Sequence, residues 1–129
     1  MAREENYRMQ PEILHNLDYE AISGTVSTES AGTIDDNGRK VLPAGTLVTG
    51  VTESIFDNRR QLVTQTDGAA GEEGEAPVVD GITLYDVDIT HEDAEVAIVY
   101  VGTVWANEVQ VEVTDAIRSA LPRITFVQA

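Results

Sequence analysis

The stretch that decides the fold runs from Asp80 to Trp105 and reads DGITLYDVDITHEDAEVAIVYVGTVW. Its pattern predicts a β-strand, an acidic turn and a second, more apolar strand. A hairpin that is acidic on one flank and rich in valine on the other is typical of a protein that assembles against other protein surfaces. The stretch therefore favours an interaction protein over an enzyme.

The second strand of this stretch is predicted to lie in the centre of a sheet. Residues Glu95 to Val104 are apolar on both faces, as expected for a strand that is covered on both sides. The longest apolar run, Val96 to Trp105, contains Gly102 and Thr103 and has about half of the ~20 residues that a membrane helix needs. We therefore expect a buried strand and no membrane partner.

Shorter β elements precede it. Residues Ala21 to Ser27 (AISGTVS) predict a strand with a bulge at Gly24. Residues Gly32 to Asp35 and Arg39 to Leu42 flank Asp36-Asn37-Gly38, and the Asn-Gly pair supplies the positive φ angles of a tight hairpin. This hairpin is the clearest local prediction in the chain.

The middle of the chain holds a turn, an ambiguous segment and a loop. Pro43-Ala44-Gly45 predicts a turn into a strand over Thr46 to Val51. Glu53 to Thr66 fits a short helix as well as a pair of strands, and both readings stay open. Asp67 to Asp80, DGAAGEEGEAPVVD, is rich in glycine and acids, so we expect an exposed loop.

The last third alternates strand and helix signals. Val109, Val111 and Val113 alternate with polar residues and predict a strand with one wet face. Thr114 is a candidate N-cap for a short helix over Asp115 to Leu121, which Pro122 ends, and Ile124 to Val127 predicts a final strand. The expected fold is mainly β with one or two short helices.

The N-terminal segment, Met1 to Asp18, shows neither a helical stripe nor strict alternation. We interpret it as an extended arm that adds a strand to a sheet edge on a partner, outside a β-rich domain of residues 19–129 that folds without it. A frayed terminus is the alternative. The arm reading depends on sizeable apolar side chains that a solvated tail does not need: Tyr7, Met9, Ile13, Leu14 and Leu17.

Composition excludes several classes of protein. The chain has 129 residues, the size of one domain, and a formal net charge of −15. Between Arg60 and Arg118 there are 13 acids and no lysine or arginine, so nucleic acid is not an expected partner. The absence of cysteine excludes disulfides and thiolate metal sites, and the polar start MAREENYRMQPE does not predict a signal peptide.

Catalytic and metal-binding patterns are weak. The two histidines, His15 and His91, lie in the arm and in a turn, which does not favour a catalytic triad. Glu108 and Glu112 are expected on the wet face of a strand, which does not favour a glycosidase pair. One dense acidic cluster could in principle bind Ca²⁺, namely Asp86, Asp88, His91, Glu92 and Asp93.

The spacing of Thr90 and Asp93 offers a structural explanation for that acidic turn. Thr-x-x-Asp is the pattern of a capping box, which would form the turn without a metal. The cluster also misses the spacing of EF-hand loops and zinc sites. We therefore expect no metal and no other cofactor.

Two aromatic residues, Tyr100 and Trp105, lie toward the end of the predicted central strand. Aromatic side chains serve as anchors at protein interfaces. Large aromatic side chains are also highly buried on average, and this chain has only seven of them, so core packing is the favoured prediction for both.

Three stretches carry a family resemblance: VLPAGTLVTG (Val41 to Gly50), DGITLYDVDIT (Asp80 to Thr90) and EVAIVYVGTV (Glu95 to Val104). Together they resemble the phage head decoration proteins, the lambda-type capsid-stabilising family. The resemblance spans Ala31 to Val104. It matches the C-terminal helix and the RITFV strand less clearly, and the loop Asp67 to Asp80 is particular to this chain.

The resemblance implies a small β-tulip-like domain that forms a homotrimer on the outside of an icosahedral phage head. Members of that family bind at three-fold and quasi-three-fold positions and hold major capsid proteins of the HK97-like fold against internal DNA pressure. It implies location on the capsid exterior of the virion, with assembly in the host cytoplasm. Their N-terminal segment engages the capsid lattice, which corresponds to Met1 to Asp18 here.

Two other classes share part of this pattern. A head fibre or receptor-binding appendage would share the acidic β domain and the trimer, but such proteins usually carry a fibrous repeat or coiled-coil stalk, and none is visible in the sequence. A small carbohydrate-active enzyme would need a pocket with paired carboxylates of perturbed pKa, and the sequence offers only the weak pairs above.

Overall fold

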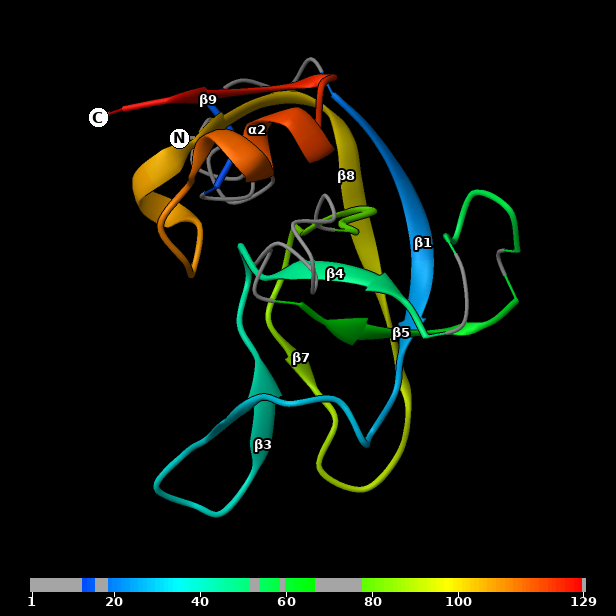
Figure 1. Ribbon diagram of the computed structural model, residues 1–129. Helices are drawn as coiled ribbons and strands as arrows, with labels where there is room; N and C mark the ends of the chain where they lie inside the picture. Colours follow the sequence, from blue (N-terminus) through cyan, green and yellow to red (C-terminus); the bar gives the residue numbers. More distant parts are fainter. Residues whose placement is uncertain (1–12, 16–18, 52–53, 59, 67–77, 129) are drawn as a thin grey trace, which may run out of the picture.

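The computed structural model describes residues 13–15, 19–51, 54–58, 60–66 and 78–128 (Figure 1). Strands make up 42% of the described residues and helices 9%, which confirms the mainly β prediction. No helix in these ranges is long and apolar enough to cross a membrane.

The described chain contains nine strands and two short helices. The strands are β1 (Glu20–Val26), β2 (Thr33–Ile34), β3 (Lys40–Leu42), β4 (Leu47–Gly50), β5 (Leu62–Gln65), β6 (Gly81–Thr83), β7 (Val87–Asp88), β8 (Ala94–Trp105) and β9 (Ile124–Val127). A 3-10 helix, η2 (Ala106–Glu108), and an α-helix, α2 (Asp115–Ala120), lie between β8 and β9. The segment Glu53 to Thr66, for which the sequence fits a helix as well as a pair of strands, therefore contains a strand, β5.

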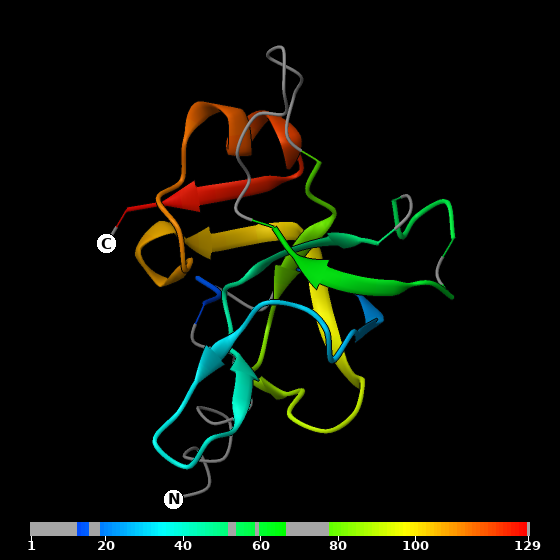
Figure 2. The same cartoon turned by 60° about the horizontal axis from the view of Figure 1, so that its bottom comes forward.

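The larger sheet closes on itself. Its order is β1-β5-β4-β6-β8-β9, and β1 also pairs with β8, so the strands from β1 to β8 in this order form a ring. The long strand β8 curves past the other strands and continues beyond the ring, where β9 lies parallel to it (Figures 1 and 2). β8 therefore has strands on both sides, as predicted.

Gly24 lies in regular pairing with Val96, and the register shift in β1 falls between Glu20 and Ala21. The predicted bulge at Gly24 is therefore wrong. A Cβ atom at this position would lie 2.6 Å from Cδ1 of Ile98. Glycine here leaves room for the Ile98 side chain inside the ring.

The second sheet contains the predicted hairpin. β2 pairs with β3, and β3 pairs with β7 on its other side. The turn closes through a hydrogen bond from the Gly38 N–H to the Asp35 carbonyl (3.0 Å), and Gly38 has a φ of 82°. The hairpin and its glycine are thus confirmed, and they lie at the opposite end of the molecule from α2 and β9 (Figure 1).

Two hydrophobic clusters form the core. The cluster that includes residues inside the ring consists of Val26, Leu42, Val48, Ile55, Val63, Val87, Ile89, Val96 and Ile98. The second joins the ring to α2, η2 and β9, and consists of Ile13, Leu14, Leu47, Val79, Ile82, Leu84, Val99, Val104, Ala106, Val109, Ile117, Leu121, Ile124 and Phe126.

The second cluster includes two residues that were assigned to the arm. Ile13 and Leu14 are each 1% exposed. The Trp105 N–H donates to the Ile13 carbonyl (2.8 Å), and the His15 N–H donates to the Thr103 carbonyl (2.9 Å). Residues 13–15, which the sequence places in the arm, therefore pack with the β domain, because this segment pairs with β8.

The segment between η2 and α2 is not a strand, contrary to prediction. Val109 is buried, and Val111 and Val113 pack against the second cluster, so the alternation reflects packing rather than pairing. The N-cap is confirmed: the Ile117 N–H donates to the Thr114 hydroxyl oxygen (3.2 Å) at the start of α2. The final strand β9 is also confirmed.

The predicted loop from Asp67 to Asp80 ends inside the protein. Residues 67–77 lie outside the described residues. Val79 and Asp80, however, are 7% and 5% exposed, so the expectation of an exposed loop is wrong for its last residues. Asp80 is held there by hydrogen bonds to neighbouring loops, described below.

Candidate functional site

A groove of about 380 Å³ opens where β9 begins. This volume is near the lower end of the range for small-molecule sites and suits one or two side chains of a partner. Residues from four separate segments line it: Ser54, Phe56, Val79, Asp80, Tyr100, Ala120, Leu121, Pro122 and Arg123.

Asp80 lies at this groove but serves the fold. Its Oδ2 atom accepts hydrogen bonds from the N–H groups of Gly50 (2.8 Å) and Ile55 (3.0 Å), and its Oδ1 atom accepts one from the Ser54 hydroxyl (2.9 Å). Both carboxylate oxygens are thus engaged with the connection that follows β4. The side chain holds that connection in place, and its geometry is that of an anchor rather than of a catalytic acid or base.

Two aromatic rings form one wall of the groove. Phe56 is 50% exposed, and its ring lies edge-on to Tyr100 with the centroids 5.1 Å apart. The Tyr100 hydroxyl reaches Oε1 of Glu20 at 3.5 Å. An exposed aromatic ring beside a groove is a typical anchor for a partner protein.

Tyr100 and Trp105, both predicted to pack in the core, are each partly exposed. Trp105 packs against the His15 ring with the centroids 4.8 Å apart. Tyr100 is instead part of the groove. Its place halfway along a curved strand, with one side at the surface, explains the partial exposure.

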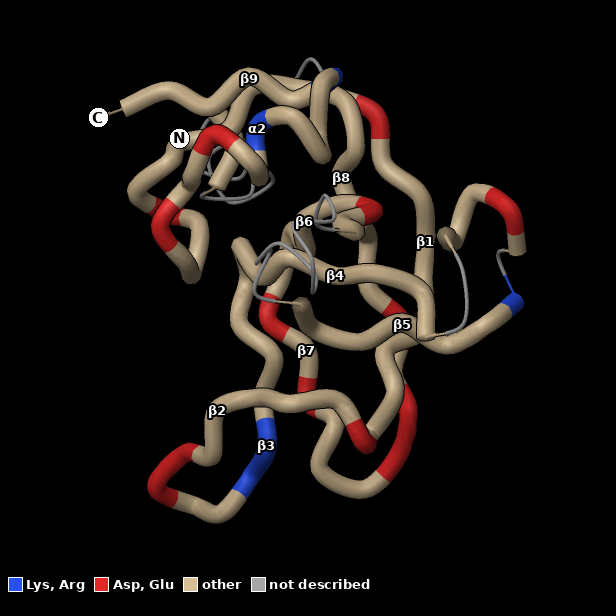
Figure 3. The backbone as a smooth tube through the Cα atoms, in the orientation of Figure 1, with Lys and Arg blue, Asp and Glu red and all other residues tan. Residues whose placement is uncertain are grey.

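The groove borders a stretch of the chain that has no acidic residue. Residues 116–129 contain Arg118 and Arg123 and no aspartate or glutamate. Arg118 lies in α2 and Arg123 just before β9, while Figure 3 shows acidic positions at the start of α2 as well as near the β2–β3 hairpin and the turn before β8. Arg118 lies over the Phe126 ring, 5.6 Å from its centroid, and donates to the Phe126 carbonyl at 3.5 Å.

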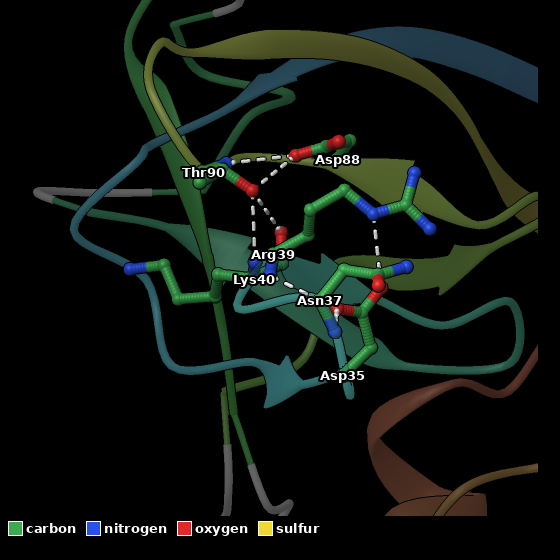
Figure 4. Close-up of polar contacts among 6 residues, drawn as sticks. All are labelled: Asp35, Asn37, Arg39, Lys40, Asp88 and Thr90. Atoms are coloured by element: carbon green, nitrogen blue, oxygen red, sulfur yellow. Dashed lines mark hydrogen bonds and ion pairs between the residues drawn. The ribbon is translucent and has the colours of Figure 1, made fainter.

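The β2–β3 hairpin carries a polar cluster of its own (Figure 4). The Asp35 carboxylate accepts from the N–H groups of Asn37 and Arg39 and pairs with the Arg39 guanidinium at 2.9 Å. Hydrogen bonding from the Arg39 backbone is the main cause that holds the pKa of Asp35 below its ordinary value. These contacts fix the turn.

A second carboxylate stabilises the neighbouring strand. The Asp88 Oδ1 atom accepts from the Thr90 hydroxyl (2.5 Å) and the Thr90 N–H (2.9 Å), and the hydroxyl bond is the main cause that lowers the pKa of Asp88. The Thr90 hydroxyl oxygen in turn accepts from the Lys40 N–H (2.8 Å). Thr90 thus links β3 to the end of β7 (Figure 4).

The acidic turn that follows is organised differently from the prediction. The Asp93 carboxylate accepts from the Thr28 N–H (2.8 Å), and no helix begins at Thr90, so the predicted capping box is wrong. Asp86 accepts from the Ala44 N–H (2.8 Å), and His91 and Glu92 are exposed. Within the described ranges no group of three or more histidine, aspartate or glutamate side chains could hold a metal ion.

Glu108 and Glu112, the weak candidates for a glycosidase pair, do not lie on a strand. Glu108 lies in η2 and Glu112 in the irregular segment after it.

Of the predicted capsid-binding residues, Ile13 and Leu14 are buried in the chain's own core, and the other three lie outside the described residues: Tyr7, Met9 and Leu17. Sequence reasoning missed the groove, because its lining comes from segments far apart in the chain.

The chain matches no known protein family, and no curated protein matches it.

Proposed function

We propose that this protein is a structural decoration protein of a phage head. It binds the outer surface of an icosahedral capsid at three-fold and quasi-three-fold sites as a homotrimer, and it stabilises the capsid lattice against internal DNA pressure. Its partner is the major capsid protein of the HK97-like fold, and the site of action is the exterior of the virion.

One observation carries this proposal. The separate stretches that resemble the decoration proteins contribute β4, β6 and β8, and these are consecutive neighbours in one sheet, with Leu47 opposite Ile82 and Ile82 opposite Val99. Because the three strands form one continuous part of the sheet, the proposal extends the resemblance over a single folded unit.

The burial of Ile13 and Leu14 shortens the proposed capsid-binding segment. Ile13 and Leu14 pack inside the chain, so the arm that engages the capsid is the segment Met1 to Glu12, with Tyr7 and Met9 as its apolar contacts. Affinity would come from main-chain hydrogen bonds and a few buried side chains, opposed by the entropy of ordering the arm. Three arms on a trimer would act together through effective concentration.

Electron microscopy of purified heads tests the proposal. Unexpanded and expanded heads of the phage whose genome encodes the chain are imaged with and without added protein. The expected result is extra density on the outer surface at three-fold positions of at least one head form. Heads that remain bare in both forms, at protein concentrations well above those of the capsid subunits, would contradict it.

A further inference from the structure

β9 pairs with β8 along one edge, and its other edge faces away from the sheet. The Gly102 N–H donates to the Arg123 carbonyl at 3.2 Å, and Gly102 stands opposite Ile124 in a parallel register. In a parallel ladder, alternate residues direct their backbone groups to the same neighbour. Arg123, Thr125 and Val127 therefore face β8, and the backbone groups of Ile124 and Phe126 face outward.

Two of these outward groups have partners within the chain. The Ile124 N–H donates to the Leu121 carbonyl (3.1 Å), and the Phe126 carbonyl accepts from the Arg118 side chain (3.5 Å). The Ile124 carbonyl and the Phe126 N–H remain directed outward at the end of the six-stranded sheet of the described residues. An extended segment can add to such an edge through main-chain hydrogen bonds.

The positive charge of Arg118 and Arg123 near this edge favours an acidic partner segment. Arg118 and Arg123 are exposed on an acid-free stretch, while the chain as a whole carries a net charge of −15. A basic segment would be attracted to the acidic residues elsewhere on the molecule. An acidic segment would be attracted to Arg118 and Arg123. Among the described residues that line the groove, the acid is Asp80, which is buried and already hydrogen-bonded, while the nearby Glu20 meets the Tyr100 hydroxyl.

The groove supplies the apolar part of the same surface. It opens at the start of β9, with Arg123 on its rim and the Phe56, Leu121 and Pro122 side chains among its walls. An aromatic or branched side chain near one end of an added strand would fill it. We propose that the β9 edge and this groove bind an extended protein segment with alternating acidic and apolar residues.

Nuclear magnetic resonance of the full ¹⁵N-labelled chain tests this interaction, which does not depend on the assignment to a phage head. The probe is the synthetic peptide acetyl-VEFEVE-amide, and the matched peptide carries lysine in place of each glutamate. We expect saturable shifts of the amide resonances around Phe126 with the acidic peptide and none with the lysine peptide. Affinity should fall as salt rises from about 50 mM to about 500 mM, since the exposed arginines become screened.

Charge-reversal variants separate the edge from the rest of the surface. Arg118→Glu together with Arg123→Glu should weaken peptide binding by at least about tenfold, which corresponds to about 1.4 kcal/mol. Arg60→Glu makes the same change on an exposed side chain outside the groove lining and should leave affinity within about twofold. Because Arg118 packs on Phe126, Arg123→Glu alone serves as the variant that leaves that contact in place.

Four outcomes would overturn the proposal. Three of them are equal binding of the lysine peptide, shifts confined to residues away from β9 and the groove, and affinity unchanged in Arg123→Glu. A protein that sediments as an oligomer without peptide and becomes monomeric in the Arg118→Glu, Arg123→Glu variant would assign the edge to a second copy of the chain, and would also overturn it.

Discussion

Leu14 pairs with Val104 in an antiparallel bridge on one edge of β8, while Phe126 pairs with the same Val104 on the other edge. The two ends of the described chain thus meet on one strand. All three side chains lie in the same hydrophobic cluster. Residues near the N-terminus therefore contribute to the stability of the C-terminal half of the domain.

Truncation of the N-terminus should have two distinct results. Removal of Met1 to Glu12 should leave the free energy of unfolding nearly unchanged, because it removes none of the described core residues. Removal through His15 also deletes Ile13 and Leu14, and should cost about 4 kcal/mol or more, since each buried aliphatic side chain is worth about 2–5 kcal/mol. Urea unfolding followed by circular dichroism measures both. Equal stability of the two truncated proteins would show that residues 13–15 do not support the core.

Substitution of Asp80 should give a graded loss. Asp80→Asn keeps one oxygen for the Gly50 and Ile55 N–H groups but loses the charge, and we expect a loss of about 1–2 kcal/mol in the free energy of unfolding. Asp80→Ala leaves both donors buried without a partner and should cost about 3 kcal/mol or more. Asp57→Asn, on an exposed side chain of the same connection, is the control. An alanine variant as stable as the asparagine variant would argue against the anchor.

Two glycines with similar backbone angles should respond differently to alanine. Gly38 has a φ of 82° and open space around the position of a Cβ atom, so Gly38→Ala should cost about 1–2 kcal/mol. Gly45 has a φ of 86°, and its Cβ atom would lie 2.2 Å from the Glu108 carbonyl oxygen. Gly45→Ala should therefore cost about 3 kcal/mol or more. Thermal unfolding of the two variants under one condition checks the order, which should not invert.

Acid should loosen the β2–β3 hairpin. The pKa values of Asp35 and Asp88 are lowered from 3.8, so between the folded and the ordinary pKa the unfolded chain binds more protons than the folded one. The stabilisation by both carboxylates is present above pH 3.8 and is lost as pH falls through the lower folded values. The carboxyl ¹³C resonances, followed from about pH 6 to about pH 2, should titrate with midpoints below 3.8.

The matched variants for this titration are Asp35→Asn and Asp36→Asn, which remove neighbouring charges from the same turn. Only the Asp35 substitution should reduce the protection of the Asn37 and Arg39 amides at neutral pH, because those amides donate to the Asp35 carboxylate. Loss of protection in the Asp36 variant as well would point to a general charge effect.

The features that sequence predicted well are local. The Asp35 to Gly38 turn and the Thr114 cap each depend on residues within a few positions of one another, so the residue types alone carry the information. The central position of β8 followed from its apolar content on both faces. Mainly β architecture followed from these elements together.

The features that sequence missed depend on distant partners. Val109, Val111 and Val113 alternate like a strand but pack against the second cluster, and Leu14 and β9 already occupy both sides of β8 where it ends. Asp80 looked like part of an exposed loop, since its donors lie around Ile55 and are not adjacent in sequence. The groove likewise exists only where β8, α2 and the connection after β4 meet.

Closure of the ring sets an order of events during synthesis. β1 is the first of the ring strands to be made and β8 the last, and 72 residues separate the contacting pair Ser23 and Glu95. At about 5–20 residues per second, β1 waits roughly 4 to 14 s with no partner on that edge. Nascent chains with such an edge can pair with one another. The chain up to Ala94 holds 19 acidic and 6 basic residues, so its like charge opposes such pairing before synthesis ends, and the acidity protects the unfinished protein as well as the finished one.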